Sequence, residues 1–289
     1  MLTADAPTIA TLRPGDEVDG VFACARKDRL QARSGVPYLA LELRDRSGAI
    51  QARAFRDADL LAGRFERGDL VRVRGRVERF REELQIEVRE IARTDAADPA
   101  AFLPVAYRDR DELEGFLEHL AREIHDPAYA ALLERLLADE PLRAALRQAP
   151  CTRGGHHAYL GGLIEHTVAV ATLALEACQL HPRLNSDVLL CAALVHDIGK
   201  TREFTYGAAI ELSDEGRLLG HIVLGQQILE PHMGGMDSER RLALLHCVLC
   251  HHGPDAAPNR RFGSPEALAL YRLNALDANV KGALEHGLP

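Results

Sequence analysis

The hydrophobic pattern changes its period once along the chain, near residues 94–110, and this change constrains the fold more than any other feature. Before it, apolar and polar residues alternate, as in half-buried β-strands. After it, apolar residues recur three and four positions apart, as on one face of a helix. A chain of 289 residues is also long enough for two domains of ordinary size. We therefore predict a multidomain β + α protein with a β domain at 1–95, a linker at 96–110 and an all-α domain at 111–289.

Four segments of the first region alternate clearly, at residues 38–43, 50–55, 70–77 and 84–88. Arg46-Ser47-Gly48-Ala49 supplies a turn between the first two segments, and Arg67-Gly68-Asp69 precedes the third. Short strands at close spacing predict a small, five-stranded barrel.

The net charge of −8 argues against a protein that coats nucleic acid without specificity. The charge is uneven, because residues 1–95 hold 18 Lys+Arg against 17 Asp+Glu and the remainder holds 17 against 26. The arginine-rich first part could present a local basic face. Bound cations would offset part of the acidic charge of the second part.

The sequence predicts a cytoplasmic protein without a membrane segment. No apolar run approaches the roughly 20 residues that span a bilayer, and the N-terminus lacks the basic start and apolar core of a signal peptide. The six cysteines lie mostly in apolar helical contexts, which favours a reducing compartment over a disulfide framework. Cys247-x-x-Cys250 looks like half of a zinc knuckle, but with no second such pair we interpret it as two small core residues.

The order of the β segments resembles the nucleic-acid-binding OB-fold, over roughly residues 18–93. The stretches YLALELRDRSGAIQARAF and FERGDLVRVRGRVERFREELQIEV carry this resemblance. Proteins that bind single strands use aromatic stacking platforms and basic grooves. The candidate stacking residues are Phe22, Tyr38, Phe55 and Phe80, and the candidate phosphate contacts are Arg53, Arg72, Arg74, Arg76 and Arg79. Alternatively, the phenylalanines fill the barrel and the arginines are solvated, but for the whole domain we favour nucleic-acid binding.

Five histidines and two aspartates occur in apolar or glycine-containing stretches of the helical region. They are His166, His196, Asp197, His221, His251, His252 and Asp277. Neutral imidazole and ionised carboxylate are ligands for Zn, Mn, Fe and similar divalent ions. One histidine in an apolar helix is more often a core residue, but five in one domain are hard to explain in that way. We therefore predict a metal centre.

Seven ligands are too many for one tetrahedral ion but suit two ions of higher coordination, and Asp197 could bridge them through its two oxygens. Two ions about 4 Å apart can activate a water and stabilise both sides of an in-line phosphoryl displacement. The sequence therefore predicts hydrolysis of a phosphoester.

The pattern of His, His-Asp, His, His-His and Asp resembles the HD-domain metal-dependent phosphohydrolases. The resemblance implies two ion positions, one held by His166, His196, Asp197 and Asp277 and the other by Asp197, His221, His251 and His252. It also implies that Lys200, in the HDIGK block, faces the substrate phosphate or supports the site, although a solvated helix cap is an alternative. Asp197, Lys200 and His221 are thus the candidate catalytic residues.

The resemblance extends to bacterial 3′→5′ exoribonucleases of the YhaM type over residues 15–285. Its motifs are HHAYLGGLIEHTVAVA, HDIGKTREF, LGHIVLG, LHCVLCHHG and GSPEALALYRLNALDANV, placed after an OB domain. The resemblance implies that the OB domain holds single-stranded RNA, or single-stranded DNA, and that the metals release nucleoside 5′-monophosphates from the 3′ end. Two divalent ions are expected, Mn²⁺ first and Fe²⁺, Co²⁺ or Mg²⁺ as alternatives. His156 and His157 would contact substrate or cap the following helix.

Two other functions are compatible with the sequence. One is an HD phosphodiesterase or nucleotidase for small nucleotides, with a regulatory OB domain. The other is a nucleic-acid-binding protein whose HD domain is not catalytic. A homo-oligomer is suggested by analogy only.

Overall fold

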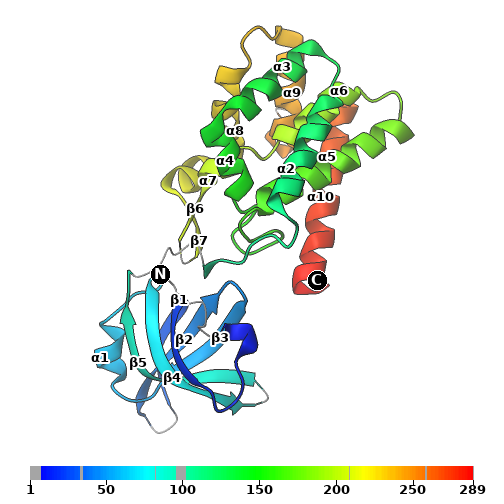
Figure 1. Ribbon diagram of the computed structural model, residues 1–289. Helices are drawn as coiled ribbons and strands as arrows, with labels where there is room; N and C mark the ends of the chain where they lie inside the picture. The colour runs from blue at the N-terminus through cyan, green and yellow to red at the C-terminus, as the bar shows by residue number, and fades with distance from the viewer. Residues whose placement is uncertain are drawn as a thin grey trace. The chain divides into compact units, whose positions relative to one another are not determined.

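Five strands of the N-terminal region close into a barrel in the order β1-β2-β3-β5-β4 (Figure 1). The computed structural model describes residues 8–32, 35–81, 83–95, 102–207, 209–257 and 259–288. Neighbouring strands are antiparallel except β3 and β5, which pair in parallel. The strands are β1 (Glu17–Gln31), β2 (Pro37–Asp45), β3 (Gly48–Ala54), β4 (Leu70–Phe80) and β5 (Glu83–Arg93). The predicted five-stranded barrel is confirmed.

Alternation along the strands places every second side chain inside the barrel. On β4, Val71, Val73 and Val77 are buried, whereas Arg72 and Arg74 between them are exposed. The short helix α1 (Ala58–Ala62) follows β3 and closes one end of this core with Leu61. The barrel therefore has an apolar interior and an arginine-rich exterior.

The first strand was the hardest to locate from the sequence. Its register shifts between Cys24 and Arg26, and the charged residues that follow interrupt the alternation. A second shift lies between Arg74 and Gly75, where a Cβ atom on Gly75 would come within 2.3 Å of the Glu87 carbonyl oxygen. Glycine is required there by this close approach of two backbones.

Helices form almost all of the second region, as the sequence predicted. They are α2 (Arg110–Arg122), α3 (Pro127–Ala138), α4 (Glu140–Gln148), α5 (Gly162–Leu180), α6 (Ser186–Val195), α7 (Lys200–Glu203), α8 (Asp214–His232), α9 (Ser238–Cys250) and α10 (Pro265–His286). Most begin at a residue whose side chain accepts a hydrogen bond from a backbone N–H of the first turn. These caps are Asp109, Asp126, Asp139, Asn185, Ser213, Asp237 and Ser264.

Helix α5 lies at the centre of the helical core and packs against α2, α4, α6 and α10. Contrary to the sequence-based expectation, its length and composition would allow it to cross a bilayer. However, half of its most apolar window is buried in the fold, and it carries the buried polar residues Glu165 and His166. We therefore interpret α5 as the core helix of this domain.

Two short strands were missed by the sequence analysis. β6 (Phe204–Tyr206) pairs with β7 (Ile210–Leu212), and three residues are too few to show a period of two. The predicted linker lies partly outside the described residues, and within its C-terminal part Val105 forms a bridge with Leu160.

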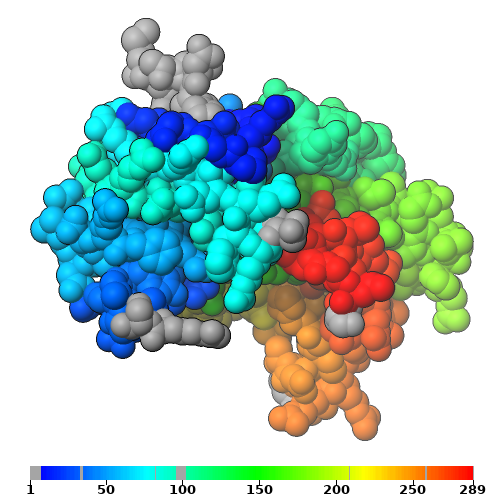
Figure 2. Space-filling view, turned by 90° about the horizontal axis from the view of Figure 1, so that it is seen from below, coloured from blue at the N-terminus to red at the C-terminus, as the bar shows by residue number. Residues whose placement is uncertain are grey.

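The chain forms two compact units, one of Met1–Pro104 with Tyr206–Ile210 and one of Val105–Thr205 with Glu211–Pro289. In the second unit, the last turns of α10, red in Figure 2, lie at the surface.

Candidate metal centre and nucleic-acid surface

Six of the seven predicted metal ligands meet in the helical domain, although they come from distant parts of the sequence. They are His166 in the first turns of α5, His196 and Asp197 just after α6, His221 within α8, and His251 and His252 just after α9. Four of the six are buried, His221 is partly exposed and His252 is exposed. The fold therefore brings together the side chains that the sequence singled out.

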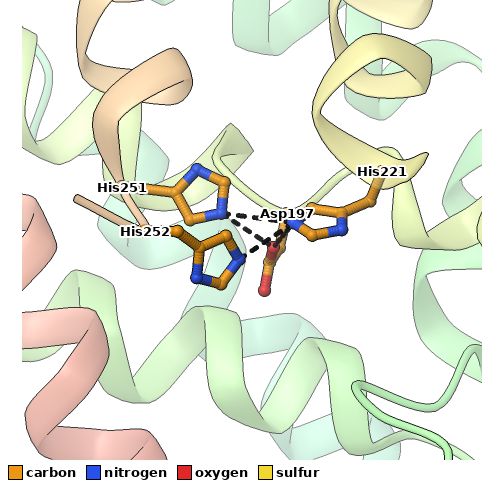
Figure 3. Close-up of side chains that lie close together, drawn as sticks. All are labelled: Asp197, His221, His251 and His252. Atoms are coloured by element: carbon orange, nitrogen blue, oxygen red, sulfur yellow. Dashed lines mark hydrogen bonds and ion pairs between the residues drawn. The ribbon is translucent and has the colours of Figure 1, made fainter. Parts of the chain in front are cut away.

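One oxygen of Asp197 faces three of the histidines (Figure 3). Asp197 Oδ1 lies 3.5 Å from His221 Nε2 and 3.4 Å from His251 Nε2. These two nitrogens are 3.4 Å apart, and His252 Nε2 is 3.0 Å from His221 Nε2. We call this set, Asp197, His221, His251 and His252, the Oδ1 group.

The other oxygen of Asp197 faces the remaining two histidines. Asp197 Oδ2 lies 3.5 Å from His166 Nε2 and 3.4 Å from His196 Nε2, and the two nitrogens are 3.3 Å apart. We call this set, His166, His196 and Asp197, the Oδ2 group. One carboxylate is therefore shared by two groups of potential ligands.

The spacing of these atoms fits divalent ions. Three atoms 3.3–3.5 Å apart form a nearly equilateral triangle, whose centre is about 2.0 Å from each corner, the length of a bond between imidazole and a first-row divalent ion. In addition, Asp197 Oδ1 is buried and has no hydrogen-bond partner among the described residues. A buried carboxylate oxygen normally has a partner, so the donor set and this orphaned atom both fit a cation.

Hydrogen bonds on the far side of the imidazole rings keep their Nε2 atoms directed at Asp197. His196 Nδ1 donates to the Ala193 carbonyl at 2.8 Å, and His251 Nδ1 donates to the Val248 carbonyl. His221 Nδ1 donates to Glu203 Oε1 at 3.0 Å. A histidine that donates through Nδ1 presents an unprotonated Nε2, which is the form that binds metals.

Two glycines allow His221 to reach the cluster. Gly220 has a left-handed backbone, with φ 70° and ψ 161°, and interrupts α8 directly before His221. Gly199 lies so close to α8 that a Cβ atom on it would be 1.9 Å from the His221 carbonyl oxygen. The glycine of HDIGK therefore serves the packing of α7 against α8, and the glycine of LGHIV allows the left-handed backbone directly before His221.

Asp277 is placed behind His166, not beside the Nε2 cluster. Its Oδ2 accepts a hydrogen bond from His166 Nδ1 at 2.6 Å and lies 3.1 Å from His157 Nε2. In this position Asp277 holds the His166 ring from its far side. A direct bond between Asp277 and an ion stays a prediction.

The expectation that His157 contacts substrate is not supported, because His157 is buried. It is 1% exposed, its Nδ1 is 2.9 Å from the Tyr159 hydroxyl, and its Nε2 contacts Asp277. The Tyr159 hydroxyl in turn donates to Glu165, which pairs with Lys281. Both ring nitrogens are thus occupied by protein groups, so no part of the ring is free for a substrate.

The backbone of His157 is also unusual, because its φ of 51° is rare for a residue with a side chain. Its carbonyl approaches Gly162, where a Cβ atom would lie 2.1 Å from that oxygen. His156 differs from His157 because it is partly exposed, with its Nε2 3.7 Å from Cys151 Sγ. A substrate contact by His156 stays a prediction.

Lys200 is buried inside the centre, not solvated at a helix end. It is 5% exposed, its Nζ lies 2.7 Å from Asp197 Oδ2, and it donates to Cys151 Sγ at 3.5 Å. Burial raises the pKa of Asp197, but opposing effects, led by the Lys200 ammonium, outweigh it and hold that pKa well below its ordinary value. Asp197 is therefore ionised, as a metal ligand must be.

Burial has the opposite consequence for the histidines. It lowers the pKa of His166 and of His251, and it outweighs the nearby Asp277 and Asp197 carboxylates, which act in the opposite direction. Both rings are therefore neutral near pH 7, which is the state required for coordination. Cys151 is also protonated, because burial raises the pKa of its thiol to about 12.

On the barrel, four predicted contact residues form one exposed cluster, which we call the ring surface: Tyr38, Arg53, Phe55 and Phe80. The Tyr38 and Phe55 rings stack with centroids 5.5 Å apart. The Arg53 guanidinium lies 5.0 Å from the Phe80 centroid and 5.9 Å from that of Tyr38. Phe55 and Phe80 are 42% and 43% exposed. Exposed rings beside arginine suit the stacking of bases.

The other predicted contacts on the barrel are arranged differently. Phe22 is 2% exposed and fills the barrel core, so its prediction as a stacking residue is wrong. Arg72 and Arg74 both pair with Asp19 of β1, at 2.8 Å and 3.0 Å. Arg76 is exposed on the same strand. Phosphate contacts by these arginines stay predictions.

Sequence analysis missed three residues that support the centre: Cys151, Tyr159 and Glu203. Glu203 follows the HDIGK motif, and its carboxylate accepts hydrogen bonds from both the backbone N–H and the ring of His221. Its neighbours Arg202 and Thr201 are polar as well, so no local pattern marked it. Cys247 and Cys250 are buried, as expected, and join no cluster of potential ligands among the described residues.

Comparison with protein families confirms the predicted fold class of an OB-fold followed by an HD domain. Residues 163–279 match the HD domain, and residues 23–93 match an OB-fold nucleic acid binding domain. The HD match contains all seven predicted ligands, and the OB match contains the ring surface.

Individual proteins are similar in sequence over nearly the whole chain. The 3′-5′ exoribonuclease YhaM of Shouchella clausii is 28% identical over 283 residues, covering 93% of this chain and 85% of the relative. YhaM of Bacillus subtilis is 27% identical over 277 residues, covering 92% and 86%. Among solved structures, the second OB-fold domain of replication protein A from Methanococcus maripaludis is 20% identical and covers 32% of this chain and 96% of that domain, with a TM-score of 0.26.

Proposed function

We propose that this chain, which joins an OB-fold domain to an HD domain and is similar to the YhaM exoribonucleases over more than nine-tenths of its length, is a metal-dependent 3′→5′ exoribonuclease. It hydrolyses single-stranded RNA to nucleoside 5′-monophosphates, with single-stranded DNA as a second substrate. The observation that carries the proposal is Asp197, whose two oxygens each face a separate group of imidazole nitrogens.

In this proposal the centre would hold two divalent ions, one at the Oδ1 group and one at the Oδ2 group, with Asp197 belonging to both groups. Mn²⁺ is the first candidate, with Fe²⁺, Co²⁺ and Mg²⁺ as alternatives, because nitrogen and oxygen donors accept all of these. When bound, such ions supply Lewis acidity and an activated water next to a phosphodiester.

The residues around the ligands prepare the centre for this chemistry. Glu203 and the Ala193 and Val248 carbonyls fix the imidazole rings, so that little reorganisation is needed when ions bind. Lys200 adds a buried positive charge that favours a phosphate nearby. His156, partly exposed beside this cluster, contacts the substrate in this proposal.

The barrel supplies affinity for a polymer. Tyr38, Phe55 and Phe80 offer ring faces to bases without regard to sequence, and Arg53 adds charge next to them. The β2 and β3 strands and the adjoining loops are the surface through which OB-folds bind oligonucleotides. The ring surface begins at the start of β2 and ends at the β4–β5 turn, so it coincides with that region.

Degradation of a 5′-labelled single-stranded RNA with Mn²⁺, followed on a sequencing gel, tests the proposal. We expect a ladder of products that shortens progressively from the 3′ end, its loss with EDTA, and its return with added Mn²⁺. A 3′-phosphate or blocked 3′ end should slow the first step. Internal fragments without a ladder would contradict the exonuclease, and cleavage of small nucleotides alone would support a small-molecule phosphodiesterase instead. Binding of RNA without any hydrolysis would support a non-catalytic protein.

A further inference from the structure

Lys200 makes the two sides of Asp197 unequal. On one side, Oδ1 has no hydrogen-bond partner among the described residues, although His221 Nε2 and His251 Nε2 lie 3.5 Å and 3.4 Å from it. On the other side, the Lys200 ammonium contacts Oδ2 at 2.7 Å. The same carboxylate therefore offers a bare oxygen to one group of ligands and a paired oxygen to the other.

We infer that the two ion positions fill in order, the Oδ1 group first and the Oδ2 group second, because an ion at Oδ2 must share that oxygen with the Lys200 ammonium or displace it, and in both cases it meets a positive charge at close range. This inference rests on the proposed metal-dependent function. It assigns Lys200 the role of an internal cation that competes with the second ion, in addition to any contact with substrate.

The surroundings of Lys200 hold its ammonium where it competes. Its Nζ has a second contact with Cys151 Sγ at 3.5 Å, and that thiol is itself fully buried. The contact with Cys151 keeps the ammonium beside Oδ2, so an ion that binds this oxygen is repelled by it. This competition lowers the affinity of the Oδ2 group for an ion. It lowers the affinity of the Oδ1 group less, because Lys200 does not contact Oδ1.

The Oδ1 group also has more ligands in place. It offers three imidazole nitrogens and one carboxylate oxygen within reach of one ion, whereas the Oδ2 group offers two nitrogens and one oxygen. The rings of both groups are oriented by hydrogen bonds from Nδ1, so the difference between the groups is the number of ligands. Ligand number therefore favours the same order as the charge of Lys200.

An Mn²⁺ titration of metal-stripped protein, with free Mn²⁺ measured by electron paramagnetic resonance, tests this order without any RNA. We expect two binding steps separated by at least about tenfold in Kd for the unsubstituted protein. His252→Ala should weaken the tighter step, and His196→Ala should remove the weaker one. Two equal steps, or loss of the tighter step in His196→Ala, would overturn the inference.

Lys200→Met keeps the approximate shape of the side chain and removes its charge. We expect it to tighten the weaker step by about tenfold or more and to change the tighter step much less. Lys27→Met in the barrel, which removes a lysine from a contact with Glu66 at 3.0 Å, is the matched control and should leave both steps unchanged. An unchanged weaker step in Lys200→Met would refute the role of Lys200.

Lys200→Gln provides a second test if Lys200→Met does not fold, since its amide can donate to Oδ2 without a charge. It should also tighten the weaker step. The RNA degradation assay separates the order of ion binding from the proposed exoribonuclease function. Two unequal binding steps in a protein that does not degrade RNA would keep this inference and reject the proposed function, whereas equal steps in an active exoribonuclease would do the reverse.

Discussion

The metal centre and the ring surface differ in how far water reaches their functional groups. At the centre, Asp197, His166, His196 and His251 are buried, and almost every polar atom has a partner in the protein. On the ring surface, Phe55 and Phe80 expose close to half of their side chains. In the buried centre, the contacts between protein groups indicate what the site binds. On the exposed ring surface, such contacts are few, and the ligand makes most of the contacts that define the site.

The largest effect is expected at the group shared by both ion positions. Asp197→Asn keeps the volume but loses the charge that both positions need, so hydrolysis of RNA should fall by at least about 1,000-fold. Steady-state rates on single-stranded RNA in Mn²⁺ measure this. Asp214→Asn, at a carboxylate that is 92% exposed, is the control and should retain full activity. Substantial turnover by Asp197→Asn would show that the buried centre is not the catalytic one.

A smaller loss is expected one contact further from the ions. His157→Asn tolerates the left-handed backbone but withdraws the ring from Asp277, and so loosens His166. Affinity for Mn²⁺ should fall by about 10- to 100-fold, as for other residues that orient metal ligands. Activity should return at high Mn²⁺, which a misfolded protein would not show. His125→Ala, at an exposed histidine, is the control. Unchanged Mn²⁺ affinity would mean that the contact with Asp277 is dispensable.

Substitution on the ring surface should affect binding of polymers and leave the chemistry intact. Phe55→Ala removes one stacking face, worth about 1–3 kcal/mol per base, so affinity for single-stranded RNA should fall roughly 5- to 150-fold. Hydrolysis of a small phosphodiester should be unchanged. Phe116→Ala is a matched control, because Phe116 is 42% exposed and has Arg108 5.3 Å from its ring centroid. Equal losses for both variants would contradict a specific role for the barrel surface.

The smallest effect is expected in how the free energy of unfolding of the metal-stripped protein depends on pH. Burial lowers the pKa of His156 to about 4, and it lowers the pKa of His166 and His251 as well. The unfolded chain therefore binds more protons than the folded one below the ordinary histidine pKa of about 6.5. The free energy of unfolding should decrease as the pH falls from about 6.5 towards 4. Urea titrations at several pH values measure this, and bound Mn²⁺ should raise stability most above pH 6.5. Stability that rises on acidification would contradict neutral imidazoles in the fold.

Sequence predicted the ligands of the centre well because metal chemistry restricts residue types. Few roles besides metal binding place a histidine pair and a His-Asp pair in apolar stretches of one domain, and the structure brings six of the seven side chains together. It could not show that Asp277 lies behind His166, because ring orientation depends on contacts between α5 and α10 that spacing does not encode. For the same reason His157 looked like a substrate contact.

The barrel was predicted well in outline and less well in detail. Alternation identifies strands, but it does not say which of the two faces is inside. Phe22 therefore looked equivalent to Phe55, although only Phe55 lies outside the barrel. Arg72 and Arg74 looked free for phosphate because their partner Asp19 lies more than 50 residues away in the sequence.

The most direct measurement is a crystal structure of the Mn²⁺-soaked protein with anomalous diffraction at the manganese edge. Our account predicts two peaks on either side of Asp197, one bonded to His221, His251 and His252 and the other to His166 and His196, with the first more fully occupied at limiting Mn²⁺. Peaks elsewhere in the molecule, or a single ion that does not touch Asp197, would contradict the shared-carboxylate centre on which the proposed function depends.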